Sequence, residues 1–366
     1  MDNTSFRILD TAINSFELVT ALAQRKIKVT HRTDPKRNTE EILFSLPIGP
    51  YKGRWLYRVN LTDRSIGCSG GVTTTFFGHN LHVFTNEAAQ LRAITQIVSN
   101  PLRDLTGLLL PEQFEPVIER AELTRHHIIP DSIDKADALR RIDQMQMVLL
   151  PSRYSNEGRT LDNPGTIRIG KSKSSRACRT YDPCIKFIQK KNNGRPAHIP
   201  VEAWTSLCNA IEWHLRVEIM FNKRELESAG LDTIAGWEDS ATVMRLLESR
   251  YQRFGLSVAF RADQEGFTPA SVYAQHPTFV EYARHFFSNG KKGSAFNPRS
   301  GSTPRYKKYM LEHGYDVDVP FERHEFLVHG LHEILRADRA AELPLELRRN
   351  PDLFRQWWNN FKSKGA

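Results

Sequence analysis

The segment Thr166–Lys191 has the sequence TIRIGKSKSSRACRTYDPCIKFIQKK, and it carries the strongest indications of both fold and function. Its pattern predicts a β-hairpin with a strand at Thr166–Ile169, a tight turn at Gly170–Ser175 and a second strand that ends at Tyr181. Because side chains alternate between the two faces of a strand, Arg179 and Tyr181 are expected on the same face.

This hairpin is strongly basic. From Arg168 to Arg195 the chain carries nine Lys or Arg residues and one acid, Asp182. A tyrosine within such a patch suits attack on a DNA phosphodiester, with the surrounding charge holding the DNA backbone and favouring ionisation of the phenol. The alternative is a half-buried strand tyrosine in a hairpin that only binds nucleic acid. The cations expected to contact DNA here are Arg168, Lys171, Lys173, Arg176 and Arg179.

Composition narrows the class of protein. The chain has 366 residues, 40% of them apolar, which gives room for two domains with real cores. Its net charge of +9 favours a polyanionic partner. The four cysteines form no CxxC pair, as expected for reduced thiols. Acidic residues interrupt the N-terminal apolar positions, and no apolar run approaches the ~20 residues of a membrane helix, so we expect a cytoplasmic protein without a membrane partner.

Alternating and helical patterns outline the remaining elements. Trp55–Leu61 alternates as a half-buried strand, and Gly71–Phe84 reads as a second strand broken at Gly78. His31–Glu40 is expected to be a polar loop. Asn86–Ser99 predicts an amphipathic helix with Asn86 as its N-cap.

Two further strands carry polar residues. In Pro116–Ile129 one face should present Ile118, Arg120, Glu122, Thr124 and His126. A carboxylate beside an arginine and a histidine can hold a divalent cation near phosphate, or can simply form a solvated sheet face with a surface ion pair. In Leu215–Phe221, Arg216 and Glu218 share the face opposite the apolar residues. Beyond Leu231 the pattern becomes helical, with helices expected at Trp237–Phe254 and Arg305–His313.

Five motifs in order resemble those of the replication initiation proteins of filamentous phages, the gene II/X family. HLRVEIMFNKRELESAGL resembles the family's R-x-E strand followed by a basic helix. FFGHNLHVF resembles its GHN motif, and VIERAELT its R-x-D strand, with Glu122 in place of the usual Asp. RTYDPCIKF falls where the family carries its Tyr-x-Lys nucleophile motif, and STPRYKKYMLEHGYDV resembles its C-terminal helix.

The resemblance implies a rolling-circle nickase, which cuts one strand of a duplex phage or plasmid origin, keeps the 5′ phosphate on Tyr181 and later rejoins the displaced strand. It implies duplex origin DNA and single-stranded DNA as partners, together with a host helicase and polymerase. Pro183 stands where the family has its lysine, so Lys186 is the nearest replacement. Mg²⁺ or Mn²⁺ is expected at His79, Glu122 and His126. Further DNA contacts are expected from Arg216, Arg305, Lys307 and Lys308.

The expected fold is α+β: a mostly antiparallel sheet with covering helices, followed by a mainly helical C-terminal domain. We expect an N-terminal segment at 1–40, the nicking endonuclease at 41–231 and a helical domain for DNA binding or assembly at 232–366. Two alternatives remain open. A non-enzymatic initiator or repressor would use the same basic surfaces only to bind DNA. A nuclease that activates water with a metal would need a tight carboxylate cluster, which the spacing does not provide.

Overall fold

The fold was analysed in a computed structural model of the whole chain. The structure describes residues 1–34, 39–49, 51–77, 86–105, 108–109, 114–131, 133–136, 138–140, 142, 166–169, 177–184, 195, 201–254, 256 and 334–340.

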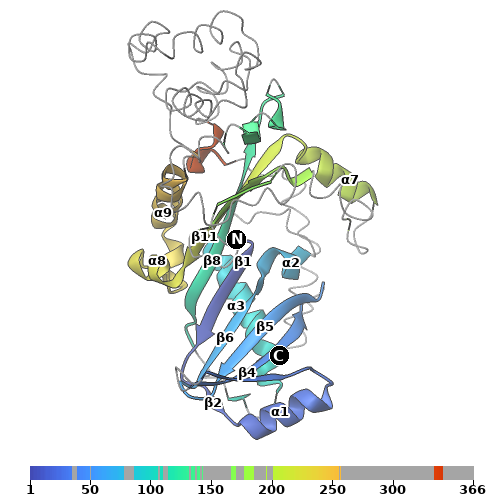
Figure 1. The fold of residues 1–366 in the computed structure, drawn as a ribbon, viewed down its shortest axis with the longest axis vertical. Coiled ribbons are helices and arrows are strands. Elements are labelled where there is room, and N and C mark those ends of the chain that lie inside the picture. Colours follow the sequence, from blue (N-terminus) through green and yellow to red (C-terminus); the bar gives the residue numbers. More distant parts are fainter. Residues whose placement is uncertain are drawn as a thin grey trace, which may run out of the picture.

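A nine-stranded sheet forms the body of the described part, and every pair of neighbouring strands in it is antiparallel (Figure 1). Together with the helices this confirms an α+β fold built on a mostly antiparallel sheet. In spatial order the strands are β3 (Thr30–Asp34), β4 (Thr39–Ile48), β5 (Gly53–Asn60), β6 (Ser65–Gly71), β1 (Asn3–Ile8), β8 (Val117–Ile128), β11 (His214–Asn222), β10 (Cys178–Tyr181) and β9 (Thr166–Ile169). A second, two-stranded sheet pairs β2 (Ala12–Ile13) with β7 (Leu108–Leu109).

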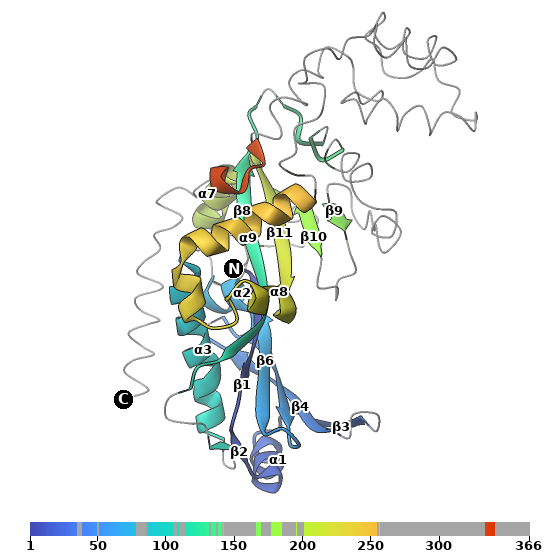
Figure 2. The same cartoon turned by 90° about the vertical axis from the view of Figure 1, so that its left-hand side faces the viewer.

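Helices α3 and α9 lie on one face of the large sheet (Figure 2). The helices are α1 (Ser15–Gln24), α2 (Val72–Phe77), α3 (Glu87–Arg103), α7 (Val201–Ala210), α8 (Lys223–Ser228) and α9 (Ser240–Arg253), with 3-10 turns η2 (Ala235–Glu238) and η6 (Ala337–Arg339). Within the described ranges none of these helices combines the length and apolar character needed to cross a membrane.

The core lies between the sheet and these two helices. Alternate residues of β5 are buried, and its Tyr57 hydroxyl donates a hydrogen bond of 2.8 Å to the carbonyl of Val98 in α3. In α3 the buried residues recur at helical spacing, as the amphipathic pattern predicted, and the Asn86 side chain caps the helix by accepting from the amide of Ala89 at 2.9 Å. One face of the sheet is thereby covered, and the opposite face is left for polar side chains.

The first residues of the chain belong to the middle of the sheet. β1 pairs with β6 on one side and β8 on the other, so the expected N-terminal segment at 1–40 supplies a central strand as well as the edge strand β3. The expected polar loop His31–Glu40 is wrong for its described residues, because the first of them complete β3 and the last begin β4, which pair with each other.

Two further expectations are corrected by local geometry. Val72–Phe77 forms α2, where a strand was expected. Its Thr75 hydroxyl donates to the carbonyl of Gly71 at 2.6 Å and accepts from the indole N–H of Trp55 at 2.8 Å, so the side chain of this β-branched residue stabilises the turn. In β8 the register against β1 shifts at Glu119, and the resulting bulge turns Ile118 into the core.

The predicted helical C-terminal region is described only in part. Its helix at Trp237–Phe254 is divided at Asp239, whose carboxylate accepts from the amide of Ala241 at 3.0 Å and starts α9. Before it, Trp237 lies in η2 and donates to the carbonyl of Leu231 at 2.7 Å. The predicted helix Arg305–His313 lies outside the described residues.

Candidate functional site

Three adjacent strands, β8, β11 and β10, bring the predicted polar residues together on one face. The antiparallel register aligns two rows across these strands, Tyr181 with Arg216 and His126, and Arg179 with Glu218 and Thr124. This confirms the predictions that Arg179 shares a face with Tyr181 and that Arg216 shares one with Glu218.

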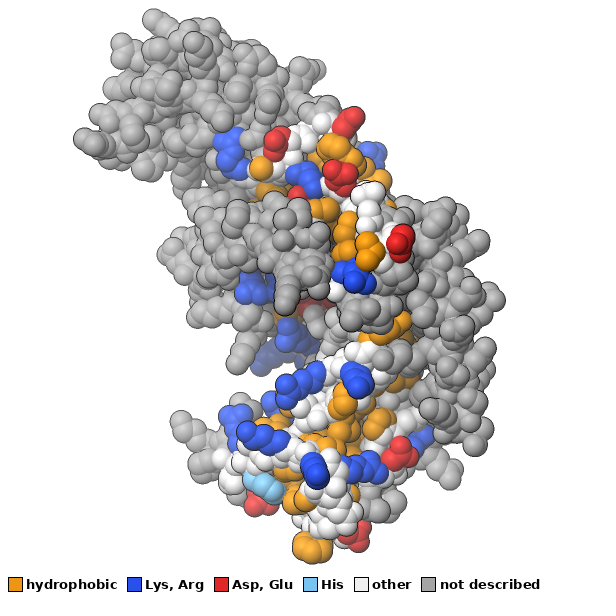
Figure 3. All heavy atoms as spheres, turned by 90° about the vertical axis from the view of Figure 1, so that its right-hand side faces the viewer, with side chains coloured by type: hydrophobic (Ala, Val, Ile, Leu, Met, Phe, Trp, Pro, Cys, Tyr) orange, Lys and Arg blue, Asp and Glu red, His pale blue; other side chains and the backbone are white. Residues whose placement is uncertain are grey.

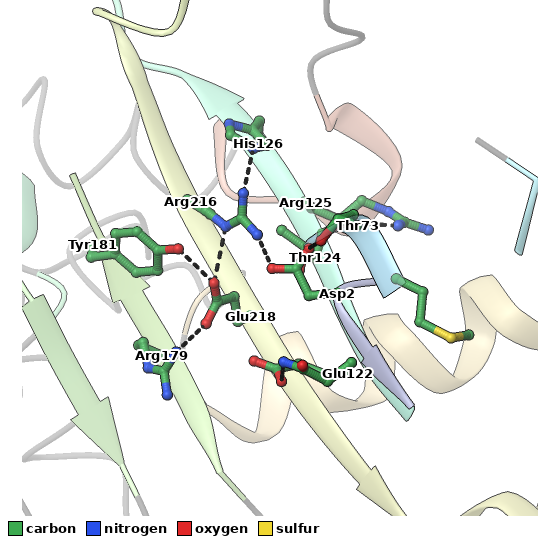
Figure 4. Close-up of polar contacts among 12 residues, drawn as sticks. Asp2, Thr73, Glu122, Thr124, Arg125, His126, Arg179, Tyr181, Arg216 and Glu218 are labelled. Carbon is green, nitrogen blue, oxygen red and sulfur yellow. Dashed lines mark hydrogen bonds and ion pairs between the residues drawn. The ribbon is translucent and has the colours of Figure 1, made fainter. Parts of the chain in front are cut away.

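Glu218 is the centre of the cluster (Figure 4). One of its oxygens, Oε1, accepts from the Tyr181 hydroxyl at 2.5 Å and from Nε of Arg216 at 3.0 Å. Its other oxygen accepts from Nη1 of Arg179 at 2.6 Å. The carboxylate is 3% exposed, so these charge-assisted hydrogen bonds replace the water it would otherwise bind.

A second carboxylate enters the cluster from the start of the chain. Arg216 is fully buried and also binds Asp2, whose other oxygen accepts from the Thr73 hydroxyl of α2 at 3.2 Å. Nη1 of Arg216 lies 3.4 Å from Nε2 of His126. Two acids therefore surround this buried guanidinium, as a buried charge requires.

The chemistry of Tyr181 differs from the sequence expectation. The side chain is 2% exposed, and its pKa is raised well above the ordinary value, first because burial disfavours the phenolate and second because Glu218 is negative. The expectation that the basic surroundings favour ionisation of the phenol is wrong: Arg179 acts in that direction but is outweighed. What the site provides is a hydrogen-bond acceptor, Glu218, already in contact with the phenolic proton.

Of the three residues expected to bind a divalent cation, Glu122 and His126 are described. They lie on the same face of β8, but four residues at ~3.3 Å each separate their backbones by about 13 Å. Glu122 accepts from the Asn3 amide at 2.5 Å, and burial, followed by the charge of Glu218, raises its pKa to about 7. No group of three His, Cys, Asp or Glu side chains within the described ranges is arranged to hold a metal ion. Glu122 and His126 therefore do not fit a shared metal site by themselves, and His79 lies outside the described residues.

The predicted DNA-binding residues differ in their exposure and in whether the structure describes them. Arg168 lies directly opposite Arg179 on β9, and both line a groove on the open face of the sheet. Arg216 is engaged inside the cluster and presents no surface to solvent. The other predicted site residues lie outside the described part, namely Lys171, Lys173, Arg176, Lys186, Arg305, Lys307 and Lys308.

Sequence reasoning missed two members of the cluster. Glu218 carried a signal, since it shares a strand face with Arg216 and lies within the R-x-E motif. Asp2 carried none, because its contact with Arg216 joins residues 214 positions apart. Comparison of the chain with models of known protein families and with curated protein sequences gives no match.

Proposed function

We propose that this chain is a rolling-circle replication initiator that cuts one strand of a duplex phage or plasmid origin through Tyr181 and later rejoins it. The observation that carries the proposal is the Tyr181–Glu218 hydrogen bond of 2.5 Å, beside a groove lined by arginines. The net charge of +9 and the five ordered motifs support a DNA substrate.

In the proposed step Tyr181 is the nucleophile and Glu218 is the proton acceptor. Oη of Tyr181 attacks the scissile phosphorus, and the phenolic proton passes to Glu218, which already accepts it as a hydrogen bond. The phosphorus–oxygen bond to the 3′ oxygen breaks, and that oxygen takes a proton from solvent, leaving a 3′-OH and a 5′-phosphotyrosine. Attack by a 3′-OH on the same phosphotyrosine reverses the step and rejoins the strand. The ester conserves the phosphodiester bond energy, so rejoining needs no nucleotide.

Arg179 has a distinct role in this scheme. It holds Oε2 of Glu218 at 2.6 Å, while its side chain is 28% exposed and lines the groove. It is therefore placed to contact both the proton acceptor and an incoming phosphate. Arg216, fully buried, orients Glu218 from the other side.

A second candidate function is favoured by one observation. Tyr181 is 2% exposed, which is typical of a structural side chain, and a nucleophile must be reached by its phosphate. A non-enzymatic initiator or repressor would keep the tyrosine buried and use only the basic surface to bind DNA.

Detection of a covalent protein–DNA adduct distinguishes the two functions. The full chain is incubated with supercoiled origin DNA and Mg²⁺, which the resemblance implies, and the products are run on a denaturing gel. We expect a protein–DNA adduct and a nick with the wild type, neither with Tyr181→Phe, and both with the control Tyr57→Phe. The control also removes a hydroxyl from a buried tyrosine, but on the helix-covered face. Nicking by Tyr181→Phe at the wild-type rate would overturn the assignment, and origin binding without any adduct would favour the second function.

A further inference from the structure

A groove of about 740 Å³ runs over the face of the sheet opposite α3 and α9. It is lined from strands β1, β5, β6 and β8, with Arg168 and Arg179 at the end next to the Tyr181 cluster. In Figure 3 the Lys and Arg side chains of this face gather around a hollow. Its volume lies within the ~300–1,000 Å³ usual for ligand pockets, which is enough for a few nucleotides of one strand.

Most charges in the groove are already neutralised. Arg7 pairs with Glu119 at 2.9 Å and with Asp63 at 3.4 Å. Arg58 lies 3.8 Å from Glu41, and Arg179 is held by Glu218. These pairs leave less charge for a ligand than an arginine without an acid beside it would.

Two of the arginines that line the groove, Arg120 and Arg168, lack such an acidic partner among the described residues. Neither Arg120 nor Arg168 forms an ion pair with another described residue, and Nε of Arg120 is buried without a hydrogen-bond acceptor. A partly desolvated guanidinium without an acceptor is costly, and an oxyanion such as a phosphate would satisfy it. Both arginines line the groove together with Glu122, whose carboxylate accepts a hydrogen bond from the Asn3 side-chain amide at 2.5 Å.

The rest of the lining offers no surface for bases to stack on. Among the described residues around the groove the single aromatic is Phe6, and its ring is fully buried in the core on the other side of β1. The floor between the arginines consists mainly of small residues, among them Ser5, Gly67 and Ser69. Proteins that grip single strands by their bases present aromatic side chains for this purpose.

We propose that this groove binds one polynucleotide strand through its phosphates, with Arg120 and Arg168 as the phosphate contacts, and does not read the bases. The inference builds on the proposed DNA substrate but not on cleavage. It implies that sequence preference for an origin comes from another part of the chain, and that the groove only guides the strand towards Tyr181.

The test compares two short probes of equal length, oligo-dT and its fully abasic counterpart, by fluorescence anisotropy with the full-length chain. The variant is Arg120→Gln with Arg168→Gln, which keeps side-chain bulk and removes both charges. We expect it to weaken binding at least tenfold, by the same factor for both probes, and to flatten the slope of log K against log salt by about 1.4, at ~0.7 per contact on a single strand. Arg54→Gln is the matched control, since Arg54 is exposed on the same face but bonds Ser45 outside the groove lining.

Several outcomes would overturn the proposal: a double variant that binds like the wild type, a loss that appears only with the base-containing probe, or an equal loss in the Arg54→Gln control. A loss of folding in the double variant is detected by its urea midpoint. In that case Arg120→Lys and Arg168→Lys, which retain the charge, are measured instead and must keep the salt slope. The proposed cleavage can fail separately, since absence of an adduct leaves these binding results unchanged.

Discussion

At the scale of residues, one buried carboxylate, Glu218, binds a tyrosine and two arginines. Alternation along Leu215–Phe221 was enough to place Arg216 and Glu218 on one face. The ionisation state of Tyr181 was not predictable in the same way. Nine nearby cations in the sequence suggested an acidic phenol, whereas its behaviour is set by burial and by Glu218 from another strand.

Glu218 and Tyr181, which form a hydrogen bond with each other, should differ in what they contribute to stability. Glu218→Gln removes one of the two acids beside buried Arg216 and the acid bound to Arg179, and should cost about 3–5 kcal/mol of unfolding free energy. Tyr181→Phe removes one donor from a carboxylate that keeps both arginines, and should cost about 1–2 kcal/mol. Urea unfolding of both variants checks the order, and a larger loss for Tyr181→Phe would show that Glu218 is not the centre of the cluster.

At the scale of elements, strands and helices with a strong apolar periodicity were predicted correctly, whereas local irregularities of the backbone were not. β5 and α3 follow their apolar patterns, although α3 continues beyond Asn100 with Pro101 inside it. α2 was mistaken for a strand because three consecutive threonines favour strands, whereas here Thr75 binds both Gly71 and Trp55. The bulge at Glu119 leaves no mark in the alternation of β8.

His127 links β8 to α9 and to Ile334, and it gives a pH-dependent prediction. Nδ1 of His127 in β8 lies 2.9 Å from the carbonyl of Ile334, which can only accept, so Nδ1 carries the proton and Nε2 accepts from the Tyr251 hydroxyl of α9 at 2.8 Å. Burial lowers the pKa of His127 to about 4 from 6.5. Between pH 4 and pH 6.5 the histidine is protonated in the unfolded chain but neutral in the folded one. The stability that this group contributes is therefore present above pH 6.5 and is lost as pH falls towards 4.

The measurement is the difference in unfolding free energy between pH 7 and pH 5, for the wild type and for His127→Gln. Glutamine can still donate and accept but does not titrate, so the drop should be about 2 kcal/mol smaller in the variant. Other titrating groups, His214 among them, act equally in both proteins and cancel. The same drop in both proteins would contradict the buried neutral histidine.

At the scale of the whole molecule, the first strand of the chain lies in the middle of the large sheet. The six residues of β1 are too short a pattern to reveal that they lie between β6 and β8, whose pairing residues begin some 60 and 110 positions later. An N-terminal segment at 1–40 was expected from the sequence, whereas the structure places two strands from this range, β1 and β3, in the large sheet.

Deletion of residues 1–40 should for this reason prevent folding. It removes the strand that joins the two halves of the sheet and also removes Asp2 from buried Arg216. Far-ultraviolet circular dichroism and urea titration of residues 41–366 should show no cooperative transition, whereas the full chain shows one. A cooperatively folded product of the deletion would mean that β1 is dispensable.

The central claim is that Tyr181 carries the DNA strand, and the most direct measurement identifies the amino acid in the adduct. The covalent product is digested with protease and nuclease, and the modified peptide is sequenced by mass spectrometry. We expect a nucleotide attached through phosphate to Tyr181, in the peptide that contains Cys178–Tyr181. A phosphonucleotide on any other residue, or cleaved DNA with a free 5′ phosphate and no modified peptide, would contradict it.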